Sequence, residues 1–318
     1  MLDVNDRIVR VNREFTQVFG YASEESLGRR LYDLIIPSGS QDEMQAKTEI
    51  GARSQRIDAD GVSRRKDGTR LQVSTVQVPV SVPGGVIAIY ALYRDISKYK
   101  DAESVLHALS GRLLKLQDDE RRRIAQDLHD STAQLLASLA MNLAVVNEGA
   151  GALDPRAQCA LAESVDLADQ CLREIRTVSY LLHPPELDHL GLRSALARYV
   201  DGFIQRSGIQ IQFDMPSDIG RLPQELEVAL FRIVQECLTN IHRHAGSRTA
   251  TIALTHSGSE IMLEVEDQGA GMPAGTIPGI GIASMRERAQ QLGGRLEMRS
   301  LHGGTKIKVV VPFSSAAA

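Results

Sequence analysis

The first hundred residues alternate between short runs of period-two hydrophobicity and polar turns. Apolar and polar residues alternate over 7–11, 70–79 and 86–94, which is the pattern of half-buried β-strands, and the Pro-Gly-Gly sequence at 83–85 separates the last two. Residues 12–19 and 23–28 are candidate short helices, with Ser23 as a possible cap. The pattern therefore predicts a small α+β unit.

From Ser97 the hydrophobic period becomes helical, and no proline or helix-ending glycine run intervenes before Gly149. Four leucines are spaced as in a coiled coil: Leu106, Leu109, Leu113 and Leu116. The apolar stripe resumes at Ile124 four residues out of phase, which is typical of a stutter. We expect that a signal from the N-terminal unit alters helix rotation at this point.

A second helix is predicted after the turn at 149–155, where Pro155 suits the first helical position. Its apolar residues follow a 4–3–4–3–4–3 spacing from Leu161 to Leu182, and it ends at His183 because a residue before proline is pushed out of the helical region. One such hairpin leaves its seam exposed, whereas two close a four-helix bundle. We therefore expect a homodimer; the alternative is a monomeric hairpin packed on another part of the chain.

Beyond the hairpin, helical and strand patterns alternate. Helices are predicted at 192–206, 222–244 and 282–292, and strands at 209–214, 260–266 and 306–311. The stretch 271–281 is rich in glycine and proline and lacks periodicity, so we interpret it as a mobile lid. The C-terminal part is therefore predicted to be an α/β domain.

Composition narrows the class of protein. A chain of 318 residues with 43% hydrophobic and 24% charged residues is globular and long enough for two or three domains. A net charge of −4 gives no reason to expect direct nucleic-acid binding. The three cysteines have no metal-ligand spacing, the longest apolar run is too short for a bilayer span, and no signal peptide opens the chain. We expect a cytoplasmic protein without disulfides or a membrane span.

His129 is a candidate nucleophile. On a helix it is flanked by the small residues Ala125 and Ala133, and it lies about 100° from the apolar stripe through Leu128, so its imidazole faces solvent. Asp130 follows directly. A carboxylate that holds the proton on one imidazole nitrogen leaves the other nitrogen free to attack. An ordinary surface histidine is the alternative for any single position of this kind.

A second candidate site lies in the C-terminal part. Glu236, Asn240 and His244 recur every four residues on one polar face of a long helix, and a carboxamide suits a magnesium ion shared with phosphates. Asp267 ends a strand and is placed to accept a hydrogen bond from an exocyclic amine such as adenine N6. Glycines that permit close backbone approach follow it, at 269, 271, 279 and 281, and again at 303 and 304 before Thr305.

Three resemblances join these features. The segment ERRRIAQDLHDSTAQ at 120–134 resembles the phosphoacceptor box of sensor histidine kinases of the nitrate-sensor and desaturase-thermosensor type, and LLHPPELDHLGLRSAL at 181–196 resembles the same family. The C-terminal boxes resemble the Bergerat ATP-binding fold of gyrase, Hsp90 chaperones, mismatch-repair ATPases and histidine kinases, although Gln268 and Ile282 depart from the commoner residues. No Walker A sequence occurs, which excludes a P-loop. In the first hundred residues, four segments resemble in order the landmarks of a PAS domain that lacks its usual first strand: NREFTQVFGY, LGRRLYDLI, RRKDGTRLQVSTVQV and YALYRDISKYKDAE.

The family resemblance implies a role for each candidate. His129 is the phosphorylated residue, Asp130 its base, Gln134 the side chain that positions a water for dephosphorylation, and Glu236 a catalytic group. The nucleotide would contact Asn240, Arg243, His244, Asp267, Gly269, Gly271, Gly279, Gly281 and Thr305, with Asn240 also on Mg²⁺. His183 and His189 are interpreted as structural connectors. The partner would be a response regulator with a helix-turn-helix DNA-binding output.

The expected organisation is multidomain. It comprises a PAS-like α+β sensor domain at 1–97, a signalling coiled-coil helix at 98–119, a dimerisation and phosphotransfer hairpin at 120–187, a Bergerat-fold α/β sandwich at 188–313 and a tail at 314–318. The PAS region has no histidine or cysteine, which excludes haem ligation by imidazole and a cysteinyl–flavin adduct. A small organic ligand, a non-covalent flavin or no ligand remain alternatives. For the whole chain, the alternatives to a kinase are a non-kinase ATPase and an interaction protein with a degenerate ATP site.

Overall fold

The computed structural model describes residues 1–37, 56–83, 85–216, 219–272, 279–301 and 303–313, so most of the expected lid, at 273–278, lies outside the described residues. The chain divides into two units, Met1–Ala108 and Leu109–Ala318. Helix α5 (Ser97–Asp127) begins in the first unit and continues into the second.

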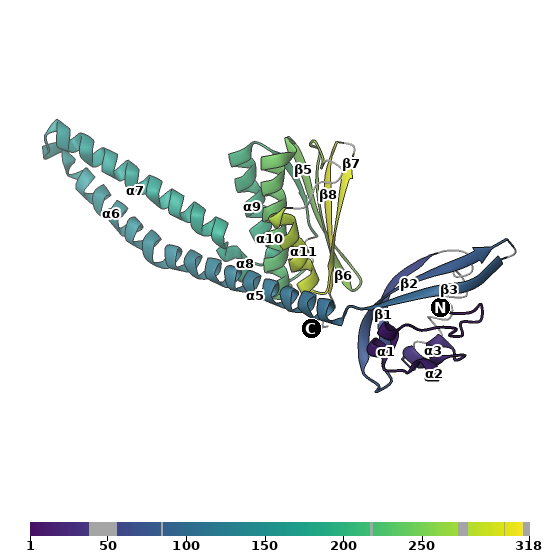
Figure 1. Ribbon diagram of the computed structural model, residues 1–318. Helices are drawn as coiled ribbons and strands as arrows, with labels where there is room; N and C mark the ends of the chain where they lie inside the picture. The colour runs from purple at the N-terminus through teal and green to yellow at the C-terminus, as the bar shows by residue number, and fades with distance from the viewer. Residues whose placement is uncertain (38–55, 84, 217–218, 273–278, 302, 314–318) are drawn as a thin grey trace. The chain divides into compact units, whose positions relative to one another are not determined.

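The first unit is built on an antiparallel sheet in the order β1-β2-β3, with β1 at Ile57–Arg64, β2 at Arg70–Val82 and β3 at Gly85–Asp95. Helices α1 (Arg13–Phe19), α2 (Ser23–Ser26) and α3 (Leu31–Ile35) precede it (Figure 1). β1 pairs with β2 only as far as Gln77, so beyond this residue one edge of β2 has no neighbouring strand. Pro79 lies in this unpaired part, where the N–H group that proline lacks is not needed for a hydrogen bond to β1. The predicted strands at 70–79 and 86–94 are therefore confirmed, each slightly longer than expected.

Two expectations for this unit are wrong, and one strand was not expected. Residues 7–11 form no strand but only isolated bridges, because the Ile8 N–H donates to the Arg29 carbonyl rather than to a neighbouring strand. Ser23 is the first helical residue of α2 and not its cap, since the chain is still extended at Ala22. β1 was not predicted at all, because its exposed residues are mostly polar and carry no apolar alternation.

The second unit begins with a long helical hairpin. α5 passes through a π-helical turn, η1 (Leu128–Thr132), into α6 (Ala133–Glu148), and after the short turn η2 (Ala150–Ala152) the chain returns as α7 (Pro155–Leu182). Asp154 caps α7 by accepting hydrogen bonds from the N–H groups of the second and third residues of the helix. The small buried residues Ala125, Ala133 and Ala168 let the two arms approach closely.

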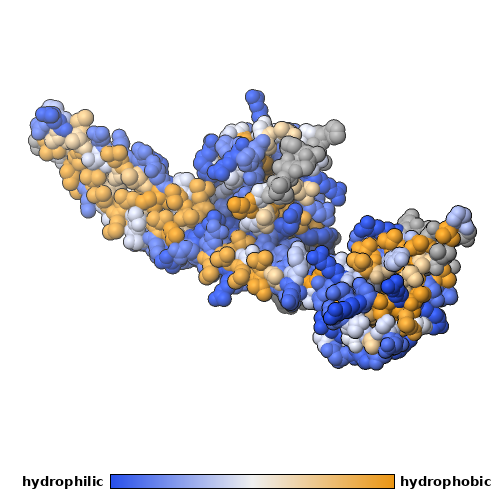
Figure 2. Space-filling model, in the orientation of Figure 1, coloured by the Kyte–Doolittle hydropathy of each residue, from blue (hydrophilic) through white to orange (hydrophobic). Residues whose placement is uncertain are grey.

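Much of the hairpin's apolar surface has no partner within the chain. Figure 2 shows hydrophobic side chains exposed along it, and the exposed set includes the four heptad leucines of α5 and several residues of α6: Leu135, Leu139, Met141, Val145 and Val146. Monomeric proteins rarely expose a contiguous apolar stripe of this kind. The hairpin therefore has the surface expected of one half of a larger bundle.

The rest of the second unit is a two-layer α/β sandwich. Its sheet has the order β4-β5-β6-β8-β7, with β4 (Gln210–Asp214) parallel to β5 (Thr249–Ser257). The remaining strands are antiparallel: β6 (Glu260–Asp267), β7 (Arg295–Leu301) and β8 (Gly304–Pro312). Helices α9 (Leu192–Ser207), α10 (Gln224–Asn240) and α11 (Ile280–Gln291) cover one face of the sheet, and the short α8 (Pro185–His189) links them to the hairpin (Figure 1).

Inward-facing residues of the strands meet these helices in one continuous apolar core. The opposite face of the sheet is polar and carries cross-strand ion pairs such as Lys306 with Glu264 and Glu266. Strands β5 and β7 were not predicted, although buried Ala250, Ile252 and Leu254 alternate along β5. The sheet therefore presents a single apolar face, and the functional cavity lies between this face and the helices.

Candidate functional site

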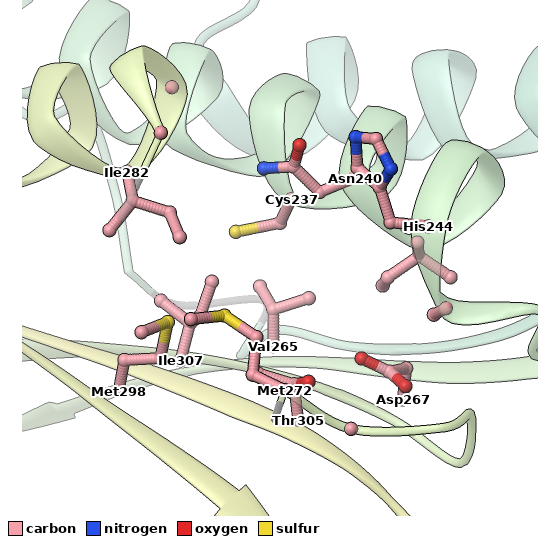
Figure 3. Close-up of a pocket in the computed structure, with 15 residues that line it drawn as sticks. Cys237, Asn240, His244, Val265, Asp267, Met272, Ile282, Met298, Thr305 and Ile307 are labelled. Carbon is pink, nitrogen blue, oxygen red and sulfur yellow. The ribbon is translucent and has the colours of Figure 1, made fainter. Parts of the chain in front are cut away.

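A cavity of about 370 Å³ opens between the carboxyl-terminal end of α10, strands β6 and β8, and the start of α11 (Figure 3). Seven residues expected from the sequence line it: Asn240, His244, Asp267, Gly271, Gly279, Gly281 and Thr305. The other lining side chains are mostly apolar and were not predicted, including Ile241, Val265, Ile282, Met298 and Ile307. In the sequence these residues could be recognised as apolar positions on amphipathic helices and strands. Only the fold shows that they line the same cavity.

Asp267 lies at the edge of this cavity at the end of β6, with its carboxylate turned toward the opening in Figure 3. Its side chain is buried, with 5% of its surface exposed, and Oδ1 accepts a hydrogen bond of 2.8 Å from the Gly269 N–H. A buried carboxylate in a mostly apolar cavity is a strong acceptor for an amine. The lining therefore suits an apolar ligand with an amino group at its edge.

Glycines at this site are needed for close packing rather than for ligand contact alone. A Cβ on Gly269 would lie 2.1 Å from the Ala245 carbonyl oxygen, and a Cβ on Gly304 would lie 1.9 Å from the Asp267 carbonyl oxygen. Real Cβ atoms do not approach backbone atoms so closely. Gly269 does not itself line the cavity, and its contribution is to let the turn after β6 pass beneath the end of α10.

Glu236 and Asn240 connect the cavity to the start of α11. The Asn240 Nδ2 donates to Glu236 Oε1 at 3.3 Å, and a Cβ on Gly281 would lie 1.8 Å from the same oxygen. With Nδ2 engaged in this way, the Asn240 Oδ1 is the atom that suits a hard cation such as Mg²⁺. The described residues contain no group of three or more histidine, cysteine or acidic side chains able to hold a metal, so phosphate oxygens and water would have to complete the coordination of any ion here.

Two of the expected nucleotide contacts, Arg243 and Gly269, do not line the cavity. Arg243 is exposed on the π-helical turn η3 (Ile241–Ala245) and does not line the cavity, although its neighbour His244 does. Glu236, which was expected to be a catalytic group, lines a separate cavity of about 420 Å³ between α5, α7, α10 and α11. The sequence spacing places Glu236, Asn240 and His244 on one helix face. In the fold, however, Glu236 lines a different cavity from the other two.

His129 lies on the π-helical turn η1, with its side chain and those of Asp130 and Gln134 exposed. The turn is closed by a hydrogen bond from the Ala133 N–H to the Leu128 carbonyl, five residues back, and was not predicted. π-Helical turns are costly and occur frequently at functional sites. Behind it, the Ser179 hydroxyl of α7 donates to the Ala125 carbonyl at 2.8 Å, which fixes the buried side of this helix segment.

His183 joins the hairpin to the sandwich. It is 4% exposed, and its Nε2 lies 3.1 Å from Asp188 Oδ2, which also accepts from Arg122 Nε at 3.1 Å. Burial lowers the pKa of His183 despite the nearby carboxylate. The residue has the environment of a structural connector between α7 and α8.

Three family models match three separate parts of the chain. A PAS domain model matches residues 1–98, a histidine kinase model matches 120–187, and the model described as "Histidine kinase-, DNA gyrase B-, and HSP90-like ATPase" matches 225–315. The chain belongs to the sensor histidine kinases. Both the expected PAS domain and the two expected kinase regions are thereby confirmed at the level of family.

The chain is similar to named relatives of this family. The sensor histidine kinase MctS of Rhizobium johnstonii is 32% identical over 221 residues, which are 67% of this chain and 48% of MctS. The signal transduction histidine-protein kinase/phosphatase DegS of Brevibacillus brevis is 25% identical over 323 residues, covering 98% of this chain and 80% of DegS. The chain therefore spans about half the length of the first relative and most of the second.

Among solved structures, the Erythrobacter litoralis EL346 blue-light activated histidine kinase matches with 18% identity and a TM-score of 0.38, covering 99% of this chain and 94% of that one. Within the residues that the structure describes, no helix combines the length and the apolar character needed to cross a membrane.

Proposed function

We propose that this chain is an ATP-dependent protein-histidine kinase that phosphorylates itself on His129. The observation that carries the proposal is the pairing of two sites in one unit: an exposed imidazole on a π-helical turn, and a cavity with a buried acceptor at Asp267 and an oxygen ligand at Asn240. Adenine would lie against the apolar lining with its amino group on Asp267. The phosphates would extend toward Asn240 and the start of α11, whose free N–H groups favour anions.

In the proposed reaction the His129 Nε2 lone pair attacks the γ-phosphorus of ATP. The bond from that phosphorus to the bridging oxygen breaks, ADP leaves, and the Nδ1 proton of the imidazole passes to Asp130. A Mg²⁺ ion held with Asn240 would neutralise charge on the phosphates. Most of the rate enhancement in such a transfer comes from positioning and charge neutralisation rather than from covalent chemistry.

The test is incorporation of label from γ-³²P ATP into the purified chain. His129→Gln is expected to abolish incorporation while ATP binding is retained, because Gln keeps a polar side chain on the exposed turn but offers no nucleophilic nitrogen. His189→Gln, at an exposed histidine outside the phosphoacceptor box, is the matched control and should incorporate label normally. Label that persists in His129→Gln would refute the assignment.

The same test separates the two alternatives. A non-kinase ATPase would hydrolyse ATP without labelling the chain, and an interaction protein with a degenerate site would fail to bind ATP. An intact cavity lined by Asn240, Asp267 and three of the expected glycines argues against the second alternative. We also propose a cytoplasmic location, because the proposed reaction uses ATP.

We propose homodimerisation through the exposed stripe of α5 and α6. Because Leu113 and Leu139 are 66% and 47% exposed in the single chain, burying them against a second copy would remove a large apolar area from water. Substituting both residues with Glu should convert a dimer into a monomer in light-scattering measurements at micromolar concentration. A dimer that persists in this variant would place the interface elsewhere.

We further propose that the phosphoryl group passes from His129 to an aspartate of a response regulator with a helix-turn-helix DNA-binding output. Support comes from the phosphoacceptor box and from the family to which the chain belongs. The name of DegS includes a phosphatase activity, and the exposed Gln134 is the side chain that would position water for it here. Gln134→Ala should lose phosphatase activity toward the phosphorylated regulator and keep autophosphorylation.

A further inference from the structure

One face of α5 contacts the sandwich and its connector within the second unit. The contacting residues are spaced four, three and four apart, which places them on a single side of the helix: Gly111, Lys115, Asp118 and Arg122. We call these four residues the docking face. The heptad leucines lie on the other side of α5, so a dimer formed through them leaves the docking face available.

Asp118 is the centre of this face. Its Oδ1 accepts from Arg232 Nε of α10 at 2.9 Å, and its Oδ2 pairs with Arg288 Nη1 of α11. The side chains of Asp118, Arg232 and Arg288 are 12%, 4% and 9% exposed, so the whole cluster is withdrawn from water. The other ion pair that α5 makes with α10, Lys115 with Glu225, is 68% and 74% exposed and therefore weak by comparison.

Arg232 is also held at its other nitrogens. Its Nη2 donates to the Leu182 carbonyl at the end of α7 at 2.7 Å, and its Nη1 donates to Gln235 Oε1 at 2.7 Å. Gln235 in turn donates to the Leu181 carbonyl at 3.1 Å. A single cluster therefore links both arms of the hairpin to α10 and α11, the two helices that flank the nucleotide cavity.

The cluster has more positive than negative charge. Burial lowers the pKa of Arg232 to about 10, and the positive charges of Arg121 and Arg288 act in the same direction, while Asp118 opposes them. Removing the Asp118 carboxylate would leave two buried guanidinium groups facing each other without a counter-ion. Breaking a buried pair in this way is strongly unfavourable, whereas an exposed pair can be lost with little effect.

The docked arrangement places Glu236 away from the phosphoacceptor. The cavity that Glu236 lines is bounded on α5 by Gln117 and Arg121. His129 follows Arg121 by eight residues, which at about 1.5 Å per residue is about 12 Å further along the helix axis. Reacting atoms must approach to about 3–3.5 Å for transfer. For Glu236 to act as a catalytic group at His129, the sandwich therefore has to move along or away from α5.

We propose that Asp118, by bridging Arg232 and Arg288, is a latch that holds the ATP-binding sandwich on the docking face in a state that does not transfer phosphate. This inference rests on the proposed kinase function and adds its regulation. Release of the latch precedes autophosphorylation, so any signal that weakens the contact of α5 with these two arginines activates the enzyme.

The test uses the full chain and the initial rate of labelling of His129 at saturating γ-³²P ATP. Asp118→Asn keeps the size of the side chain and removes its charge, and it is expected to raise the rate about fivefold or more, since loss of about 1 kcal/mol of docking energy changes a population by that factor. Lys115→Gln breaks the exposed pair on the same docking face and is the matched control, with an unchanged rate. ATP affinity, measured by calorimetry, should be unchanged in both variants.

A second variant and a second measurement distinguish loss of the latch from misfolding of the Asp118→Asn variant. Arg288→Gln removes one arm of the latch from the other side and should also raise the rate, and amide hydrogen exchange over 111–122 should become faster in both latch variants. A rate at or below that of the unsubstituted chain in both, with ATP binding retained, would overturn the latch. Failure of the unsubstituted chain to label His129 would instead overturn the proposed function, so the two failures are distinguishable.

Discussion

Replacing Asp267 with Asn tests the assignment of the nucleotide cavity most sharply. The carboxylate is 5% exposed, and one of its oxygens already accepts from the Gly269 N–H at 2.8 Å. The amide oxygen of Asn can keep that bond, so the turn after β6 should stay in place. The other side-chain position changes from an acceptor to an NH₂ donor, which would face the donor amine of adenine.

The expected loss follows from the hydrogen bond that is removed. A hydrogen bond to a charged group contributes about 1.5–3 kcal/mol, which corresponds to about a 10- to 150-fold increase in the Kd for ATP. Guanine carries a carbonyl oxygen where adenine carries its amine, so the new donor should favour GTP. The variant is therefore expected to lose most of its preference for ATP over GTP, and isothermal titration calorimetry with both nucleotides measures this directly.

Glu266→Gln is the matched control. Glu266 precedes Asp267 on β6 but points to the polar face of the sheet, where its Oε2 lies 3.4 Å from Lys306 Nζ. The control should leave both dissociation constants unchanged. An unchanged ATP affinity in Asp267→Asn, or an equal loss for ATP and GTP, would refute the idea that this carboxylate recognises the adenine amine.

Three further predictions follow from the same geometry. Gly281→Ala would place a Cβ 1.8 Å from Glu236 Oε1 and should lower the autophosphorylation rate about tenfold or more; Gly151→Ala, with open space around it, should not, and equal rates for the two would contradict the packing argument. Burial lowers the pKa of His183 from its ordinary value of 6.5, so the unfolded chain binds the proton more readily and stability is lost as pH falls below about 6.5. In thermal unfolding between pH 7.5 and 5.5, His183→Asn should show a smaller fall in Tm than the unsubstituted chain, and an identical fall would count against this role. Insertion of seven residues after Leu109 should preserve regulation because the heptad phase is kept, whereas insertion of two should scramble it; the stutter hypothesis fails if neither insertion changes activity or its control.

The hairpin shows how much a local pattern can specify. The position of α7 could be predicted from Asp154 and Pro155 at one end and from the His-Pro-Pro sequence at 183–185 at the other, because capping and steric exclusion act between near neighbours in the chain. Period-two alternation likewise predicted β6 and β8 to within two residues. Seven of the residues expected to bind nucleotide line one cavity, which the order of the motifs along the chain had indicated.

Other features depended on partners far away in the sequence. β1 has almost no apolar alternation and forms because Arg70–Gln77 lies opposite it. The apolar lining of the nucleotide cavity comes from α10, α11 and three strands, and no single segment reveals that these residues share a space. The π-helical turn at His129 could not be recognised from the 3.6-residue hydrophobic period, since it adds only one residue to a single turn.

The sequence by itself therefore determined the hairpin, several of the other elements, the family and the chemistry available at each motif, because these depend on residue type and on spacing within one or two helical turns. Only the tertiary structure shows which acidic side chain forms an ion pair with which arginine. Asp118 is separated from Arg232 by 114 residues and from Arg288 by 170, and in the sequence it is one more acidic residue on a charged helix. Its environment comes from the folded chain, because burial of an ion pair requires three helices to exclude water from the same place.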